Sequence, residues 1–385
     1  MFQFTRLPPL SLYLHFPWCL RKCPYCDFNS HALKGALPEQ AYIDALTRDL
    51  EQELPLVWGR RIHSLFLGGG TPSLFSAAAL DRLFSELRAR LSFAPDIEIT
   101  LEANPGAVER QRFQEYRDIG INRLSIGVQS FDDAQLQGLG RIHHRQDAVR
   151  AVEAAQTAGL DNINLDLMFA LPRQTLAQAL ADLEQAISLQ PAHISWYQLT
   201  IEPHTRFHHH PPPLPDDEHA WSMQQRGGEK LAAAGYTQYE VSAWARTAQC
   251  RHNLNYWQFG DYLGIGAGAH GKLTRGDTQS ICRRWKIRQP DAYMRHAGRE
   301  AALAGTQELT PEDAALEFMM NALRLRQGFA PEWFPQHAGL PLEFVARPLR
   351  EAQDRGWIQQ TADRILPTAE GQRFLNDLLG LFLPD

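Results

Sequence analysis

Three cysteines stand within eight residues of one another near the start of the chain, as Cys19-Leu-Arg-Lys-Cys23-Pro-Tyr-Cys26. Residues 11–16 before them form an apolar run typical of a buried strand. The cysteines are therefore expected on the loop that leaves this strand. Closely spaced thiolates are metal ligands, so the fold must leave one strand end free to hold a metal centre.

Zinc and an iron–sulfur cluster are the two metal centres to compare. A structural zinc site needs four ligands, and His15, His31 and Asp27 do not form a second pair at a zinc-finger spacing. A cubane [4Fe-4S] cluster has four irons, so three cysteines leave one iron open to a substrate or cofactor. The spacing favours the cluster. A zinc-binding interaction module is the alternative, and it predicts a colourless protein.

Strand-like and helix-like patterns alternate over the first half of the chain. Apolar runs predict strands at residues 11–16, 62–67, 97–103, 123–129, 163–169 and 193–199. Amphipathic segments between them, such as residues 76–91 and 175–189, predict helices. The alternation predicts an α/β protein with a parallel sheet, and periodicity alone fits either a doubly wound sheet or a partial barrel of the TIM type. In both folds the functional residues lie at the carboxyl ends of the strands.

The pattern changes at residue 311. Helical segments at 311–325, at 341–355 and from 370 to about 381 surround two short strand-like runs near residues 356–358 and 365–368. Helices with a two-stranded wing predict a winged-helix-like α+β domain. Acidic side chains outnumber basic ones there, which favours a lid or docking module over a DNA-reading domain.

These patterns divide the chain into three expected regions. A core covers residues 1–240, a connecting segment covers 241–310 and the C-terminal domain covers 311–385. Residues 208–215, His-His-His followed by Pro-Pro-Pro and Leu-Pro, are expected to form an extended, solvated connection rather than a metal site.

Charge and composition limit the partners and the compartment. A net charge of −6 gives no basic footprint for a phosphate backbone, so nucleic acid is not an expected partner. No signal peptide and no apolar run long enough to span a bilayer are present, which predicts a cytoplasmic protein. Five cysteines, three of them clustered, fit a reducing compartment better than a disulfide framework.

With Tyr25 inside it and Asp27-Phe28 after it, the cysteine motif resembles the radical S-adenosylmethionine (SAM) superfamily. The resemblance implies that the open iron of a [4Fe-4S] cluster on Cys19, Cys23 and Cys26 binds the amino and carboxylate groups of SAM. Reductive cleavage then yields methionine and a 5′-deoxyadenosyl radical. It further implies that the core is a partial TIM-type (β/α)6 barrel.

A glycine run, Gly68-Gly69-Gly70-Thr71-Pro72, follows the second predicted strand. It lacks the spacing of a dinucleotide-binding fingerprint and the lysine of a P-loop, so by itself it indicates a tight turn. Beside the cysteine motif it resembles the turn that holds the methionyl amino group of SAM in this superfamily.

Polar residues interrupt apolar strands or their exits at several places, and buried charges are rare unless they are paired or bind something. The resemblance to the coproporphyrinogen-oxidase-like branch of the superfamily implies that such residues contact SAM. The implied contacts, including two tyrosines and the glycine turn, are Tyr13, Tyr25, Gly69, Gly70, Thr71, Glu102, Gln129, Arg141 and Asp166.

Two features separate the two groups within that branch. The oxygen-independent coproporphyrinogen III oxidases carry a fourth cysteine two residues after the motif, whereas the HemW-type heme chaperones carry phenylalanine, as Phe28 does here. Residues 252–257, His-Asn-Leu-Asn-Tyr-Trp, resemble the HNxxYW motif associated with heme handling. The resemblance makes His252 the candidate heme contact, because imidazole is a common ligand of heme iron; a core histidine hydrogen-bonded beside aromatic rings is the alternative.

The favoured hypothesis is a heme chaperone that carries a [4Fe-4S] cluster and SAM and passes heme to acceptor respiratory heme proteins. The alternative is a coproporphyrinogen III dehydrogenase, a radical SAM enzyme of oxidative decarboxylation. Phe28 and the HNxxYW motif favour the chaperone, which leaves open whether the protein is an enzyme. Delivery to respiratory proteins is compatible with peripheral membrane association, although the sequence has no amphipathic anchor.

Overall fold

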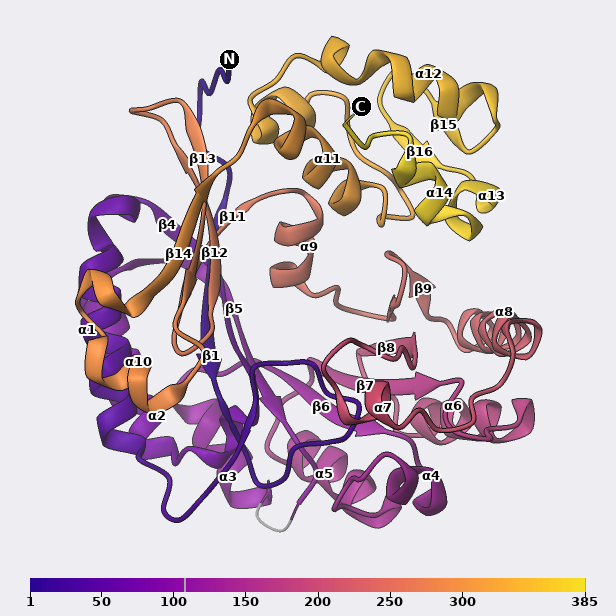
Figure 1. Ribbon diagram of the computed structural model, residues 1–385. Helices are drawn as coiled ribbons and strands as arrows, with labels where there is room; N and C mark the ends of the chain where they lie inside the picture. Colours follow the sequence, from indigo (N-terminus) through magenta and orange to yellow (C-terminus); the bar gives the residue numbers. More distant parts are fainter. Residues whose placement is uncertain (107–108, 385) are drawn as a thin grey trace.

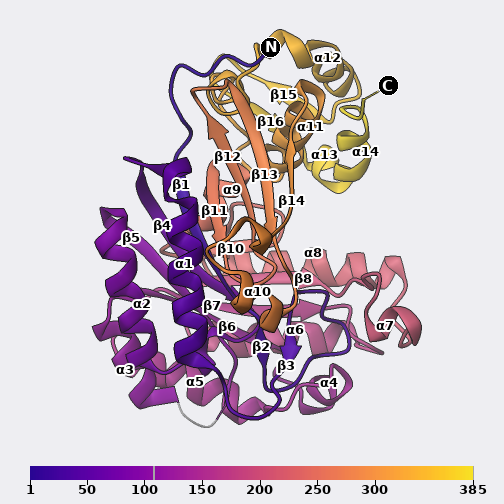
Figure 2. The same ribbon diagram turned by 60° about the vertical axis from the view of Figure 1, so that its left-hand side comes forward.

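The computed structural model describes residues 1–106 and 109–384, and one sheet of 12 strands dominates this part of the chain (Figures 1 and 2). Its strand order is β14-β13-β12-β11-β1-β4-β5-β6-β7-β8-β10-β9. The run from β1 to β8 is parallel throughout. Its strands are β1 (Leu10–Phe16), β4 (Arg61–Gly69), β5 (Ser92–Ala103), β6 (Arg123–Gln129), β7 (Ile163–Phe169) and β8 (His193–Gln198).

All six predicted strands are present in this parallel run, and β6 and β7 have the predicted bounds. The strand β5 begins earlier than predicted. Its first residues, Ser92 and Phe93, pair with the start of β4, and Pro95 lies in the register shift that follows. A proline beside a bulge makes the start of a strand hard to predict from the sequence, because it breaks the apolar pattern and removes a backbone donor.

Helices follow most of the parallel strands and cover the outer face of the curved sheet (Figure 2). The predicted helices at 76–91 and 175–189 are α2 and α6, each one residue shorter at both ends. Ser76 and Thr175 cap them through their side-chain oxygens. The helices of this layer are α1 (Glu39–Val57), α2 (Ala77–Arg90), α3 (Glu109–Asp118), α4 (Asp133–Gly138), α5 (Arg145–Thr157), α6 (Leu176–Ser188) and α8 (Asp217–Ala233).

Residues 241–310, expected as a connecting segment, supply four strands to the edge of the same sheet. The strand β11 (Asp261–Ile265) lies parallel to β1, and β12 (His270–Arg275), β13 (Ser280–Lys286) and β14 (Leu303–Glu308) follow as antiparallel neighbours. The short strands at the opposite edge are β9 (Thr237–Gln238) and β10 (Ala243–Ala245), and two helices of this region are α9 (Arg251–Trp257) and α10 (Pro290–His296).

The segment 208–215 differs from its prediction at its start. Its first two histidines end a four-residue helix, α7 (Arg206–His209), because Thr205 caps the backbone N–H of His208. The prolines that follow have no regular structure, and all three histidines are exposed.

The C-terminal residues build a second apolar cluster around Phe318, Phe329 and Phe334, to which Phe2 from the N-terminus contributes. The two predicted wing strands are present as an antiparallel pair. The predicted final helix is divided at Phe374. The elements are α11 (Pro311–Ala322), α12 (Ala346–Asp354), β15 (Ile358–Gln360), β16 (Ile365–Pro367), α13 (Ala369–Arg373) and α14 (Leu375–Gly380). No helix in the described ranges is both long and apolar enough to cross a membrane.

Candidate functional site

The three clustered cysteines lie on a loop that leaves β1 and closes on itself. Two short parallel strands, β2 (Trp18–Cys19) and β3 (His31–Ala32), hold its ends together, and the backbone N–H of Leu33 donates to the carbonyl of Cys19 at 2.8 Å. All three thiols are free and partly exposed. The sequence therefore produces a clamped loop with three available thiolate ligands.

These thiols face one cavity of about 400 Å³, named here the cysteine cavity. The carboxyl ends of the parallel strands supply its opposite wall, as expected for an α/β sheet. Of the residues predicted to contact SAM, those that line it are Tyr25, Gly69, Gly70, Glu102, Gln129, Arg141 and Asp166. Tyr13 and Thr71 line neighbouring cavities instead.

The glycine turn at the end of β4 brings bare backbone to the cavity. Gly69 has φ +110°, a conformation that favours glycine, and its N–H donates to Oε2 of Glu102 at 3.0 Å. Gly70 donates to the carbonyl of Phe16 at 2.7 Å. A Cβ on Gly70 would stand 2.5 Å from the carbonyl oxygen of Trp18, so the turn requires glycine there.

Two half-buried carboxylates, Glu102 and Asp166, place negative charge in the cavity. Burial, and then repulsion from Asp166, raises the pKa of Glu102 to about 7. Burial also raises the pKa of Asp166, although Ser125 and Asn164 donate hydrogen bonds to it. Two enclosed acids so close together suit a cationic ligand, whose charge would restore their ionised state.

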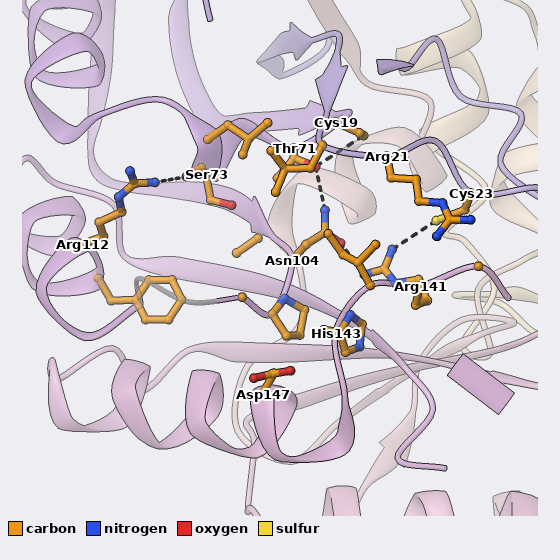
Figure 3. A pocket seen from close by; sticks show the side chains of 18 of the residues that line it. Cys19, Arg21, Cys23, Thr71, Ser73, Asn104, Arg112, Arg141, His143 and Asp147 are labelled. Carbon is orange, nitrogen blue, oxygen red and sulfur yellow. Dashed lines mark hydrogen bonds between the residues drawn. The ribbon is translucent and has the colours of Figure 1, made fainter. Parts of the chain in front are cut away.

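Arg141 links the cysteine loop to the strand ends (Figure 3). Its Nη1 donates to Sγ of Cys23 at 3.7 Å, and its Nη2 donates to Oδ1 of Asn104 at 2.6 Å. Asn104 in turn donates to Oγ1 of Thr71, which donates to Sγ of Cys19 at 3.4 Å. These residues also border a further cavity of about 420 Å³. Thr71 thus contacts a cysteine sulfur rather than the cysteine cavity.

The sequence interpretation did not assign Asn104, although it stands beside Glu102 at the same strand exit. It also missed Tyr197, which lines the cysteine cavity and donates to Oε1 of Gln129 at 3.0 Å. Gln129 has φ +68° at a register shift between β6 and β7. A non-glycine residue in this conformation is strained, and such strain is concentrated at functional sites. The position of Tyr197 near the end of β8 was the available signal.

His252, the candidate heme contact, lies in α9 and is only 1% exposed. Its Nδ1 lies 3.0 Å from Oγ of Ser64, and its Nε2 lies 2.9 Å from Oη of Tyr256. Burial, reinforced by Arg123, lowers its pKa to about 3. The ring is a neutral imidazole with both nitrogens engaged, and it lines none of the cavities described here.

The donor set of the cysteine cavity fits an iron–sulfur cluster. Three free thiols on one clamped loop face it, and the buried Nε of Arg141 has no hydrogen-bond partner within residues 1–106 and 109–384. In the same ranges, no three His, Cys, Asp or Glu side chains are placed to hold a single metal ion. A cubane cluster does not need such convergence, because each cysteine binds a different iron.

Comparison with known proteins agrees with this geometry. Residues 13–186 match the radical SAM superfamily, and residues 309–374 match the HemN C-terminal domain. The heme chaperone HemW of Escherichia coli (strain K12) is 50% identical over 382 residues, which cover 99% of this chain and 100% of that protein. The heme chaperone HemW of Haemophilus influenzae is 50% identical over 385 residues, with 99% of both chains covered.

A solved structure shares the fold. Coproporphyrinogen III oxidase (HemN) from Escherichia coli, a radical SAM enzyme, superposes with a TM-score of 0.82. The superposition covers 98% of this chain and 90% of that chain at 24% sequence identity. At this identity the similarity concerns the fold alone, which is a mixed α/β architecture with a large, mainly parallel sheet.

Proposed function

The chain belongs to the HemW family of the radical SAM superfamily, and from that membership we propose that it is a heme chaperone that binds heme and transfers it to acceptor proteins. The observation that carries the proposal is the 50% identity to HemW heme chaperones over the whole chain. Respiratory heme proteins are the proposed acceptors. Heme is the cargo, and no chemical change in it is required.

Cys19, Cys23 and Cys26 would hold a [4Fe-4S] cluster with one open iron. Their placement on one clamped loop facing one cavity supports this assignment. When bound, the cluster supplies a redox-active iron that can take up SAM. The hydrogen bonds from Arg141 to Cys23 and from Thr71 to Cys19 would stabilise the thiolates and orient them.

The strand ends opposite the cysteines would bind SAM. The bare backbone at Gly69 and Gly70 allows the methionyl part to approach closely, and the Glu102 carboxylate would accept from its ammonium group. The guanidinium of Arg141 would face its carboxylate. Gln129, Asp166 and Tyr25 would surround the rest of the molecule, since they line the same cavity. Tyr13 would act from the adjacent cavity through Glu102 and Gly69, which border both.

The architecture proposed with this function is a partial TIM-type (β/α)6 barrel over residues 1–240, with a winged-helix-like domain over 311–385. Six parallel strands with helices on their outer face support the first part. The antiparallel pair of β15 and β16 beside α12 and α13 supports the second. We also propose that the protein is cytoplasmic and associates peripherally with the membrane.

A coproporphyrinogen III dehydrogenase is the second candidate, because the fold matches HemN with a TM-score of 0.82. The side chain at position 28 is against it: Phe28 is 59% exposed and stands where the oxidases carry a further cysteine. The two functions differ in product, since one releases heme unchanged and the other converts a porphyrinogen.

One experiment separates them. The cluster is reconstituted under anaerobic conditions, and the protein is divided between two assays. Heme-loaded protein is mixed with a heme-free respiratory cytochrome, and we expect the absorption spectrum of the acceptor to become that of its holo form. The second sample receives SAM, a reductant and coproporphyrinogen III. Robust protoporphyrinogen formation together with failure to load the acceptor would refute the chaperone function.

A further inference from the structure

A second cavity, of about 580 Å³, lies beside the cysteine cavity and is here named the aromatic cavity. Its volume is within the range of about 300–1,000 Å³ that small-molecule sites occupy. Aromatic side chains contribute much of its wall: Phe28, Tyr256, Trp257, Phe259 and Tyr262. Such a wall suits a flat, largely apolar ligand.

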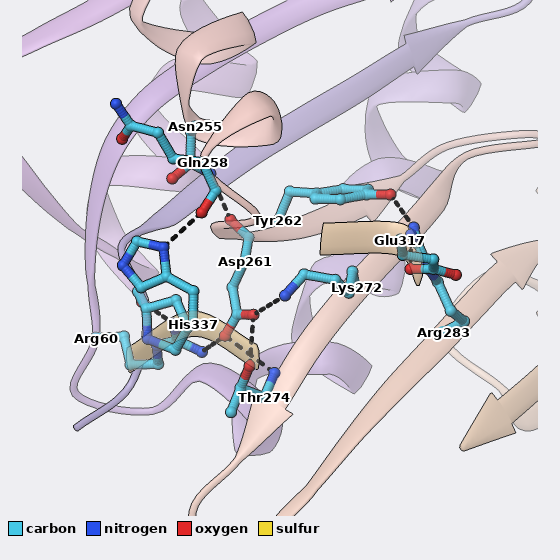
Figure 4. Close-up of polar contacts among 11 residues, drawn as sticks. Arg60, Asn255, Gln258, Asp261, Tyr262, Lys272, Thr274, Arg283, Glu317 and His337 are labelled. Carbon is cyan, nitrogen blue, oxygen red and sulfur yellow. Dashed lines mark hydrogen bonds and ion pairs between the residues drawn. The ribbon is translucent and has the colours of Figure 1, made fainter. Parts of the chain in front are cut away.

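The aromatic cavity also carries cations, of which one is available to a ligand. Lys272 forms an ion pair with the buried carboxylate of Asp261 at 3.0 Å (Figure 4). Arg283 donates hydrogen bonds to Glu317 and Tyr262. Arg288 is exposed, and its guanidinium has no hydrogen bond or ion pair with any residue that the structure describes. An anionic group on the ligand would therefore meet Arg288.

One histidine in this wall is free to coordinate a metal. His15 lines the cavity, but its Nδ1 lies 3.0 Å from the hydroxyl of Tyr13 and its Nε2 lies 2.9 Å from the carbonyl of Asn29. His270, the first residue of β12, is exposed. Throughout the described residues nothing hydrogen-bonds to its ring, which stacks on Trp285 with centroids 6.3 Å apart. Its imidazole is oriented by the strand and by this stacking.

Trp257 contributes its ring to the wall of the aromatic cavity. Its indole N–H is buried and has no hydrogen-bond partner within the described ranges. A buried donor without a partner costs about 1–3 kcal/mol.

We propose that the aromatic cavity is the heme site, with His270 as an axial ligand of the iron and Arg288 as the partner of a propionate. The inference rests on the proposed heme function and specifies its site. Within the HNxxYW motif, Tyr256 and Trp257 then form the wall that contacts the porphyrin, while His252 supports Tyr256 from behind through its 2.9 Å hydrogen bond. His252 is accordingly a positioning residue.

The test is a heme titration of the full-length, cluster-reconstituted protein under anaerobic conditions, followed by the heme Soret band after subtraction of the cluster spectrum. The variants are His270→Ala, Arg288→Gln and His252→Phe. For His270→Ala we expect loss of the nitrogen-ligated heme spectrum and at least tenfold weaker heme affinity, with recovery of the spectrum on addition of free imidazole. Arg288→Gln should weaken affinity without moving the Soret band.

Iron-free protoporphyrin IX, followed by fluorescence, is the matched probe. It needs the aromatic wall and Arg288 but no axial ligand, so His270→Ala should bind it as the wild type does. His252→Phe should keep the nitrogen-ligated heme spectrum. An unchanged Soret band and affinity in His270→Ala, or loss of nitrogen ligation in His252→Phe, overturns the assignment. Failure of the wild type itself to bind heme refutes the proposed function instead.

Discussion

Nη1 of Arg141 lies 3.7 Å from Sγ of Cys23, so a cation from the connection between α4 and α5 contacts a cysteine of the loop. Hydrogen bonds and charge at the sulfurs set the potential of an iron–sulfur cluster. Removing this cation makes the reduced cluster less stable. We expect Arg141→Gln to lower the reduction potential, measured by EPR-monitored titration. A potential equal to that of the wild type would contradict the contact.

Replacement of Cys19, Cys23 or Cys26 by Ala should abolish the cluster and leave the fold intact. The loop lies at the mouth of the sheet, and the three thiols are partly exposed, so little core packing is lost. Iron and sulfide analysis with visible absorption measures the cluster, and circular dichroism measures the fold. Cys282→Ser is the control, because Cys282 lies in β13 away from the loop, and it should retain full iron content.

Glu102 should make both stability and SAM binding depend on pH. Its pKa rises from 4.5 to about 7 in the folded protein, so folding favours the protonated form. The stabilisation from Glu102 is complete below about pH 4.5 and is lost as the pH rises through 7. At 1.36 kcal/mol per pKa unit, the free energy of unfolding falls by up to about 3 kcal/mol over this range. Urea unfolding of the SAM-free protein should show this loss, and Glu102→Gln should not.

SAM affinity should change in the opposite sense, because only the ionised carboxylate of Glu102 accepts from an ammonium group. We expect affinity to rise between about pH 6 and pH 8 in equilibrium dialysis, and to be weak and independent of pH over this range in Glu102→Gln. A pH profile identical in the two proteins would remove Glu102 from the proposed SAM site.

Gly70→Ala should weaken the glycine turn. The new Cβ would meet the carbonyl oxygen of Trp18 at 2.5 Å, and such overpacking costs about 1–3 kcal/mol. The melting temperature and the SAM affinity should both fall. Gly138→Ala in α4 is the matched control, because no atom outside its own helix lies within 4 Å of the new Cβ. Alanine also favours a helix, so this variant should be at least as stable as the wild type.

Asp261→Asn should destabilise the sheet beneath the aromatic cavity. The carboxylate is fully buried and pairs with Lys272 at 3.0 Å and Arg60 at 2.8 Å. Removing it leaves two cations with no opposite charge, at a cost of about 3–5 kcal/mol. Asp44→Asn removes one member of an exposed pair with Arg82, worth less than about 1 kcal/mol. Urea unfolding midpoints compare them, and equal shifts would contradict the prediction.

The parallel strands could be predicted because apolar residues recur at every second position, as Leu10, Leu12, Leu14 and Phe16 do in β1. The segment at residues 261–286 could not, since its strands carry lysines that are fully buried. Lys272 pairs with Asp261, and Lys286 pairs with Asp49 and Glu53 more than 230 residues earlier in the chain. A lysine in a sequence predicts an exposed position, and the two carboxylates that neutralise Lys286 are too distant in the sequence to indicate otherwise.

The site shows the same division. The cysteine motif and the glycine turn are local patterns in the sequence, and in the structure residues of both line the cysteine cavity. His252 stood out because of its motif, but Ser64, 188 residues away, and Tyr256 occupy its ring nitrogens. Nothing local marks His270 as free to bind a ligand. Its ring can bind a ligand because, among the described residues, the folded chain places no hydrogen-bond partner beside it.

Gly69, Glu102, Asp27 and Phe28 border both the cysteine cavity and the aromatic cavity. Two ligands that touch the same side chains do not bind independently, because each fixes groups that the other must use. Whatever factor SAM imposes on the affinity for heme, heme must impose on the affinity for SAM. The shared wall would thus couple the two sites, so that binding of SAM in the cysteine cavity changes how tightly heme is held in the aromatic cavity.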